Sequence, residues 1–556
     1  MAEVSRVGQP VAGPAVPAGV AAAASVAGVG LSNAAFIGVA FAREVLVAKH
    51  FGTTVLGDAF AIATTLPELF QNFLTAGLIA NAFIPVLARE ARGGREREAL
   101  NAVAIAMQWI LLVMVALLAA GLLTMRWAIR PFAPGADAAT LQEAGRTALL
   151  LWPAMPLLLA GGFAAAVMQY RRRFLVPALA PVIYTLPVVV ALAIVGARWG
   201  ALGAATGALV GAAAQLGAQW RGLGEIAAAR RLGASLVERL AANQLLYLLL
   251  PIALTQIVAH AGRCIGRAIA TTQGVGGIAA LTYAFRLTQA QVWLVVVPVS
   301  VVFLPAIAAH VSASASAKAR ELLPRALSVI LFVTVPVAVL TYVLRFDLTR
   351  LLFERGAFGP QATLLTGRTA GVYALCIIPQ GIAVLLARAA YARSDITGPL
   401  KATAAGVLVE GISAWALSRV MGLPGIALAS FLGASLQAGL LMVAESTRGV
   451  AGGRGMWSHI LLPCVAGLPM AGAALGAEWL VRSHAPASAS VVTASASLVG
   501  VALAATCVYL VASAVLHVPG YYEARRVAPD MLRAFIRGTS ALNGSTPDPR
   551  PEGGGG

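Results

Sequence analysis

Long apolar stretches separated by short polar breaks dominate the chain from residue 24 onward. A helix that crosses a membrane needs about 20 consecutive, mostly apolar residues. The stretches between charged or Gly/Pro-rich breaks predict about 14 such spans, and therefore an all-α polytopic membrane protein. The predicted spans lie near residues 24–48, 57–88, 99–125, 145–169, 177–197, 200–219, 243–269, 276–309, 324–344, 364–391, 398–418, 423–444, 456–480 and 490–516.

The composition excludes the main classes of soluble protein. The 556 residues are 59% hydrophobic and 11% charged, whereas an ordinary soluble domain is about 25% charged. The four cysteines lie in apolar stretches without a CxxC pair, so we expect reduced core residues rather than a disulfide framework or a metal site.

Basic residues predict the orientation in the membrane. The formal net charge is +18. Arginines concentrate in the loops after the second, fourth and sixth spans and in the C-terminal tail, which places both termini in the cytoplasm. Anionic membrane lipid is the expected partner of these charges, and nucleic acid is not, because the loops are too short to hold a nucleic-acid-binding domain. Residues 1–23 are predicted to be a disordered cytoplasmic N-terminus, and 517–556 a cytoplasmic tail with a disordered end.

The chain contains an internal repeat. Gly145-Arg146-Thr147-Ala148 recurs 222 residues later as Gly367-Arg368-Thr369-Ala370. The same offset relates Pro177 to Pro399, Gly203 to Gly425, Gly211 to Gly433 and Gln215 to Gln437.

This repeat predicts two lobes of six spans in parallel topology. They comprise residues 24–219 and 243–444, joined by a cytoplasmic linker over 220–242, with two further spans over 456–516. Two related lobes around a central site are typical of an alternating-access transporter. A duplicated helix bundle without transport is the alternative.

Ionisable residues within the spans indicate where chemistry takes place. Each costs about 2.5–3.5 kcal/mol in the bilayer centre, so such residues usually face a cavity or a partner. They are Arg43, Glu44, Asp58, Glu68, Arg286 and Glu410. One interpretation pairs Arg43 with Asp58 as a structural contact. The other has Arg43 and Arg286, one from each lobe, bind a pyrophosphate, because the planar guanidinium matches phosphate oxygens bidentately.

A second basic feature lies in the seventh span. His260, Arg263 and Arg267 follow one another at i, i+3 and i+7, which places them on one helical face. This stripe either lines the cavity, or Arg267 and Arg263 extend to the outer membrane interface.

A series of short motifs follows in a fixed order between residues 25 and 515. They include Phe41-Ala42-Arg43-Glu44, Phe51-Gly52, Asp58-Ala59-Phe60, Leu66-Pro67, Ala82-Phe83-Ile84-Pro85, Tyr283-Ala284-Phe285-Arg286-Leu287 and Leu352-Phe353-Glu354-Arg355-Gly356. In this order and spacing they resemble the MurJ/MviN family, which contains the lipid II flippases of the MOP exporter superfamily.

The resemblance implies a 14-helix bundle with a cationic cavity between two lobes. It also implies a hydrophobic groove, formed by the last two helices, for a polyprenyl tail. The implied activity is to flip polyprenyl-pyrophosphate-linked peptidoglycan precursor from the inner to the outer leaflet of the bacterial cytoplasmic membrane. Cell-wall synthesis proteins are then a candidate class of partner.

The chain departs from the family at four cavity positions. Ile37 and Gln71 stand where the family has arginines, Phe285 stands where it has an acid, and Gln289 stands where it has a glutamate. Arg43 and Arg286 are the retained arginines. The cargo therefore stays open between lipid II and another amphiphile, such as a polysaccharide repeat unit or a lipopeptide, with a non-transporting scaffold as a third interpretation.

Motifs for catalysis are missing from the sequence. It contains no GxxxxGK[ST], HExxH or GxSxG, and its six histidines are dispersed. We therefore expect neither an enzyme nor a bound cofactor. The membrane potential or a coupling ion would have to supply the energy; one charge moved through 100 mV is worth about 2.3 kcal/mol.

Overall fold

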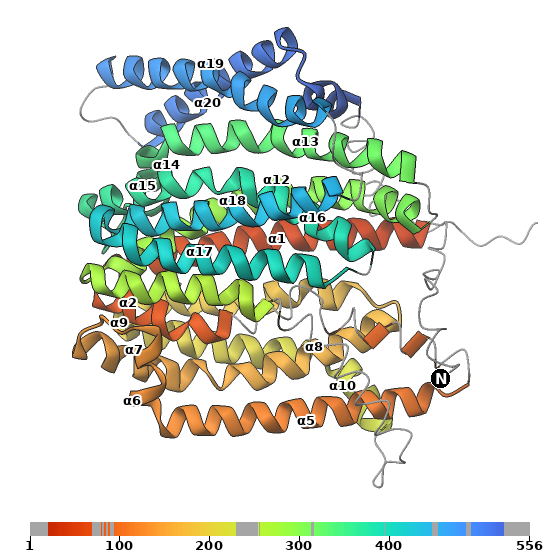
Figure 1. The fold of residues 1–556 in the computed structure, drawn as a ribbon. Coiled ribbons are helices and arrows are strands. Elements are labelled where there is room, and N and C mark those ends of the chain that lie inside the picture. The colour runs from red at the N-terminus through yellow and green to blue at the C-terminus, as the bar shows by residue number, and fades with distance from the viewer. Residues whose placement is uncertain are drawn as a thin grey trace, which may run out of the picture.

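The computed structural model describes residues 20–68, 79, 83–84, 87–88, 90, 94–229, 254, 256–312, 316–393, 395–447, 454–484 and 491–526. All regular secondary structure in these ranges is helical, which confirms the all-α class. The long helices run side by side as one bundle (Figure 1).

The first lobe contains eight labelled α-helices and one short 3-10 helix among the described residues. They are α1 (Val20–Phe51), α2 (Val55–Ala63), α5 (Glu96–Leu123), α6 (Met125–Ala128), η2 (Arg130–Phe132), α7 (Ala138–Leu151), α8 (Ala154–Tyr170), α9 (Leu175–Ala218) and α10 (Trp220–Ala229).

The second lobe begins with a helix whose described part covers residues 256–270. Its other elements are η3 (Thr271–Gln273), α12 (Gly277–Ser312), α13 (Ser316–Val343), α14 (Arg345–Phe353), α15 (Pro360–Leu375), α16 (Ile377–Ala392), α17 (Thr397–Met421) and α18 (Leu423–Thr447). The chain continues with α19 (Arg454–His484) and α20 (Val491–Val515).

The helix breaks confirm the repeat. The break between α7 and α8 returns, within two residues of the offset of 222, as the break between α15 and α16. Inside α9 the chain turns at Gly200 (φ 52°, ψ −134°), and the matching turn between α17 and α18 is at Gly422 (φ 66°, ψ −137°). A residue with a side chain adopts this backbone conformation only at a cost, so glycine marks the same reversal in both lobes.

The number of membrane spans is smaller than predicted when only described residues are counted. Eight helices there are long and apolar enough to cross a membrane, or nine if the bent pair α15–α16 is one span. In that count the 44-residue α9 is a single helix, although the sequence predicts two spans within it. Parts of the second and seventh predicted spans lie outside the described residues, and the total of 14 stays a prediction.

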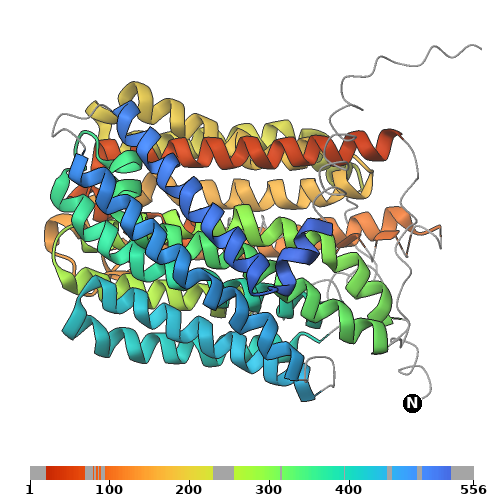
Figure 2. The same ribbon diagram turned by 90° about the horizontal axis from the view of Figure 1, so that it is seen from above.

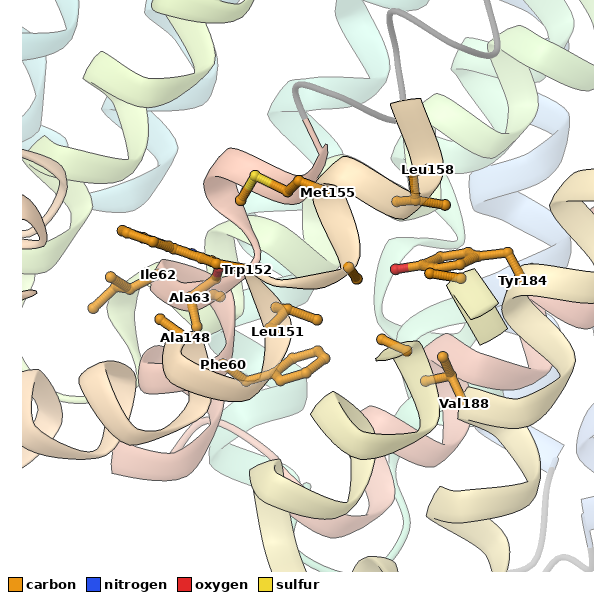
Figure 3. Packing of buried hydrophobic residues seen from close by; sticks show 14 of the residues in the cluster. Phe60, Ile62, Ala63, Ala148, Leu151, Trp152, Met155, Leu158, Tyr184 and Val188 are labelled. Carbon is orange, nitrogen blue, oxygen red and sulfur yellow. The ribbon is translucent and has the colours of Figure 1, made fainter. Parts of the chain in front are cut away.

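A packed apolar core extends through the first lobe and into the second. Leu151, Leu158 and Val188 each expose 3% or less of their surface and lie in this core with Phe60 and Tyr184 (Figure 3). They come from α7, α8 and α9 and are joined by α2, so four helices share one apolar centre.

The last two helices pack on the second lobe. Tyr509 on α20 stacks on Phe332 of α13 at 5.4 Å between ring centroids. In Figure 2, α19 and α20 (blue) run obliquely over the green helices of the second lobe. Residues 519–526 of the predicted tail are helical and pack against α13, where Tyr521 contacts Phe332.

Two predicted boundaries change. Residues 20–23 belong to α1, while 1–19 lie outside the described residues. The predicted linker 220–242 begins as α10, which packs on α8: a Cβ at Gly222 would lie 2.3 Å from the Ala164 carbonyl oxygen. The first ten linker residues therefore belong to the first lobe; residues 230–242, like the tail end 527–556, lie outside the described residues.

Candidate functional site

Charged side chains from both lobes meet near the centre of the bundle. The first lobe contributes Arg43 and Glu44 from α1, and Glu68 from the helical segment 65–68 that follows α2. The Arg43 guanidinium donates to Glu44 Oε1 from Nε at 3.0 Å and from Nη2 at 2.6 Å. Arg43 thus keeps its nearest carboxylate on its own helix.

Glu68 joins the lobes. Its Oε2 accepts from Arg267 Nη2 at 2.7 Å, and its Oε1 accepts from Arg286 Nη2 at 2.5 Å. Arg286 also forms an ion pair with Glu44. Two carboxylates of the first lobe therefore hold two guanidinium groups of the second.

The predicted basic stripe lies against the first lobe. His260 Nε2 is 3.3 Å from the Thr65 carbonyl oxygen, and Arg267 Nη1 donates to Thr65 Oγ1 at 3.2 Å. Arg263 Nη2 lies 2.5 Å from His260 Nδ1. Only 8% of the Arg267 side chain is exposed. The extension of Arg267 to the outer interface is therefore wrong, and Arg263 is also directed inward.

The proposed contact between Arg43 and Asp58 is also wrong. The Asp58 carboxylate accepts from the backbone N–H of Gly276 at 2.6 Å and of Ala279 at 2.8 Å. These groups lie at the start of α12, where helical N–H groups have no partner within the helix and the helix dipole favours an anion. Asp58 thus caps a helix of the other lobe.

The lobes touch through their backbones at the end of the bundle where α1 finishes (Figure 1). The Ala357 N–H donates to the Lys49 carbonyl oxygen at 2.8 Å. A Cβ at Gly52 would lie 2.3 Å from the Ala357 oxygen, and one at Gly276 would lie 2.4 Å from the Thr53 oxygen. Side chains could not fit at these positions, so this end of the interface is closed.

Other predicted residues lie elsewhere. Glu410 and Gln289 line a cavity of about 340 Å³ inside the second lobe, and Phe285 borders the same cavity. Ile37 is partly exposed on α1, and Gln71 lies outside the described residues.

The sequence pattern missed three further polar groups. Thr65 receives Arg267 and His260, while Gln256 and Gln380 face the cavity beside Glu410. The available signal was an uncharged hydroxyl or amide in an apolar span, which is weaker than a charge.

The cluster has an excess of positive charge. Arg43, Arg263, Arg267 and Arg286 stand against Glu44 and Glu68, so two formal positive charges are left over. Guanidinium groups at a partly buried interface are suited to bind a phosphorylated ligand through bidentate, charge-assisted hydrogen bonds. Within the described ranges, no three His, Cys, Asp or Glu side chains form a group that could hold a metal ion.

Comparisons with known sequences point to one family. The family described as lipid II flippase MurJ matches residues 47–496. A probable lipid II flippase MurJ of Rhizobium tropici is 30% identical over 460 residues, which cover 80% of this chain and 84% of the relative. The lipid II flippase MurJ of Burkholderia cenocepacia is 26% identical over 418 residues, 74% of this chain and 81% of the relative.

Solved structures share the fold. A lipid II flippase MurJ in an inward closed conformation superposes with a TM-score of 0.74 at 20% identity, covering 88% of this chain and 98% of that one. An inward-facing multidrug resistance MATE family transporter of the MOP superfamily gives 0.63 at 15% identity, with 76% and 98% covered.

Proposed function

The chain belongs to the MurJ family of lipid II flippases, and from this premise we propose that it moves lipid II across the bacterial cytoplasmic membrane. It is a multi-pass membrane transporter. The basic loops support an orientation with both termini in the cytoplasm.

The excess of two positive charges between the lobes is the observation that carries the proposal. A diphosphate that links a polyprenyl tail to a head group has two negative charges. Arg286 and Arg267 are the groups we assign to bind it, with Arg43 beside them. Glu44 and Glu68 hold these guanidiniums in the present conformation and release them when the diphosphate arrives.

A diphosphate that replaces the carboxylates of Glu44 and Glu68 leaves the buried guanidiniums with an anionic partner. An arginine without a partner in a poorly hydrated interface would be costly. Because Glu44 and Glu68 are available before and after transport, Arg43, Arg267 and Arg286 each keep a carboxylate partner in the empty site, while the site as a whole keeps its excess of positive charge. The polyprenyl tail is assigned to the surface formed by α19 and α20.

Alternating access requires the closed end to open. With the termini in the cytoplasm, the backbone contacts at Gly52 and Gly276 lie on the periplasmic side, so the site is closed toward the periplasm. The residual charge of the empty site is drawn toward the cytoplasm by the membrane potential, at about 2.3 kcal/mol per charge per 100 mV. A coupling ion is the alternative source of energy.

The test is growth of a bacterial strain depleted of its own lipid II flippase. The wild-type chain is expected to restore growth. Arg286→Gln is expected to lower the flipping rate at least tenfold, because a charge-assisted hydrogen bond of about 1.5–3 kcal/mol is lost. Arg368→Gln, an exposed arginine outside the cluster, is the matched control. Full rescue by Arg286→Gln would remove the cluster from the mechanism, and no rescue by well-expressed wild type would reject lipid II as cargo.

A further inference from the structure

The second lobe contains a polar cavity that adjoins the interlobe cluster. It has a volume of about 340 Å³, within the range of small-molecule sites. Helix 256–270 and α12, α15, α16, α17 and α18 line it. Arg267 lines the cavity and also binds Glu68, so the cavity adjoins the cationic cluster.

Amide side chains from several helices converge on this cavity. Gln256, Gln289 and Gln380 come from helix 256–270, α12 and α16, and Gln437 of α18 also lines it. Gln437 donates to Thr403 Oγ1 at 2.9 Å. For the other three amides, the described part of the chain provides no hydrogen-bond partner. All three glutamines are partly buried. Each amide can donate twice and accept twice, so these groups are available to a ligand in the cavity.

The charged side chains that line the cavity already have partners. Arg267 is paired with Glu68, and Arg263 lies against His260, so both guanidiniums belong to the interlobe cluster. Glu410 Oε1 accepts from Ser430 Oγ at 2.6 Å. The cavity therefore favours an uncharged polar ligand over an ion.

Three lining positions differ from their counterparts in the first lobe. At the offset of 222 residues, Gln380, Glu410 and Ser430 correspond to Leu158, Val188 and Ala208. These three are at most 3% exposed and belong to the packed apolar core seen in part in Figure 3. The repeat therefore does not impose polar residues at these positions, and their polarity in the second lobe points to a ligand there.

We propose that this cavity binds the carbohydrate that lipid II carries next to its diphosphate. The inference rests on the proposed function and assigns a subsite to it. Sugar hydroxyl groups both donate and accept, which matches the unpartnered amides. Phe285 and Tyr373, whose rings meet edge to face at 5.9 Å, offer an apolar wall for a sugar ring. Arg267 stands at the boundary, where the carbohydrate would join the diphosphate.

The experiment compares two lipids that share the diphosphate and differ in the carbohydrate. Binding of lipid II and of undecaprenyl diphosphate is measured on the purified full chain. Gln289→Leu and Gln380→Leu are each expected to weaken lipid II binding about tenfold and to change undecaprenyl diphosphate binding less than about twofold. Gln291→Leu is the matched control on α12, because the Gln291 amide oxygen binds Thr341 and lies outside the cavity lining.

Each outcome decides the question. Equal loss for both lipids would place the diphosphate, or a general disturbance, at the cavity and overturn the proposal. Unchanged lipid II affinity in both variants would overturn it as well. Retained undecaprenyl diphosphate binding shows that a variant is folded. Failure of the proposed function is separate, because wild type would then bind neither lipid and Arg286→Gln would have no effect.

Discussion

The two lobes share one backbone plan and differ in what fills it. Both reverse direction at a glycine with the same unusual conformation, Gly200 in the first lobe and Gly422 in the second. Both also bring two helices into close contact: a Cβ at Gly211 would lie 2.1 Å from the Tyr184 oxygen, and one at Gly433 would lie 2.6 Å from the Gly406 oxygen. The interiors diverge at matching positions: Leu158, Val188 and Ala208 lie in an apolar core, whereas Gln380, Glu410 and Ser430 line a polar cavity.

This difference separates architecture from function. Glycines at crossings and reversals determine where the helices run, because any side chain there would meet backbone. Side chains that point inward are free to vary once the backbone is set. The first lobe presents Glu44 and Glu68 to the interface, whereas the second lobe contributes Arg267, Arg286 and the polar cavity.

The largest expected effect comes from giving the first lobe the polarity of the second. Val188→Glu puts a carboxylate into a packed core without a partner such as Ser430, and should lower the free energy of unfolding by about 3–5 kcal/mol. Thermal unfolding in detergent measures the change. Val188→Gln adds similar volume without a charge and controls for packing. Equal stability of Val188→Glu and wild type would show that the first lobe is as hydrated as the second.

A slightly smaller loss is expected from the buried ion pair of the second lobe. Arg393 pairs with Glu445, whose side chain is only 2% exposed. Arg393→Ala leaves that carboxylate without its guanidinium, and we expect a loss of about 3 kcal/mol. The same unfolding measurement tests it. Arg393→Lys, which keeps the charge, should recover part of the stability; if it behaves like alanine, the loss arises from packing.

The shared backbone plan predicts matched costs at the two reversals. Gly200→Ala and Gly422→Ala each force a side chain into a conformation that costs about 1–3 kcal/mol. The nearest atoms to a new Cβ are 3.9 Å and 3.5 Å away, so clashes add little. The two losses in unfolding free energy should agree within about 1 kcal/mol. A much larger loss in one lobe would contradict the equivalence of the reversals.

The smallest effect is expected at Arg171, which occupies the position of Arg393 in the first lobe. Arg171 binds Glu96 and Glu225, each at 2.7 Å, and its side chain is 38% exposed. Exposed pairs contribute about 0.2–1 kcal/mol, so Arg171→Ala should shift the unfolding transition far less than Arg393→Ala. The loss should also shrink at high salt. Losses of equal size at both arginines would argue against burial as the source of the difference.

The sequence was sufficient to predict the helical class, the duplication and the cationic residues. Runs of apolar residues predict the helical class, and identical residues that recur at one offset predict the duplication. Charges in apolar spans identified Arg43, Arg286 and Glu68 because such residues are rare and costly there.

The pairing of those charges could not be read from the sequence. Asp58 seemed available to Arg43, yet it binds backbone N–H groups at the start of α12, and Arg43 turns to its neighbour Glu44. Which carboxylate meets which guanidinium depends on how helices of different lobes rotate and tilt, and periodicity along one helix contains no such information. The glutamine-lined cavity was missed for the same reason.

The backbone seal at Gly52 and Gly276 has a mechanical consequence. Contacts between carbonyl oxygens and bare Cα atoms have no interlocking side chains that must be pulled past one another when the lobes part. Such an interface can be closely packed and still separate after a small movement of the lobes. This end of the interface is thus held by a few separate contacts, one of which is formed by the Asp58 carboxylate. Opening can therefore begin when any one of these contacts breaks.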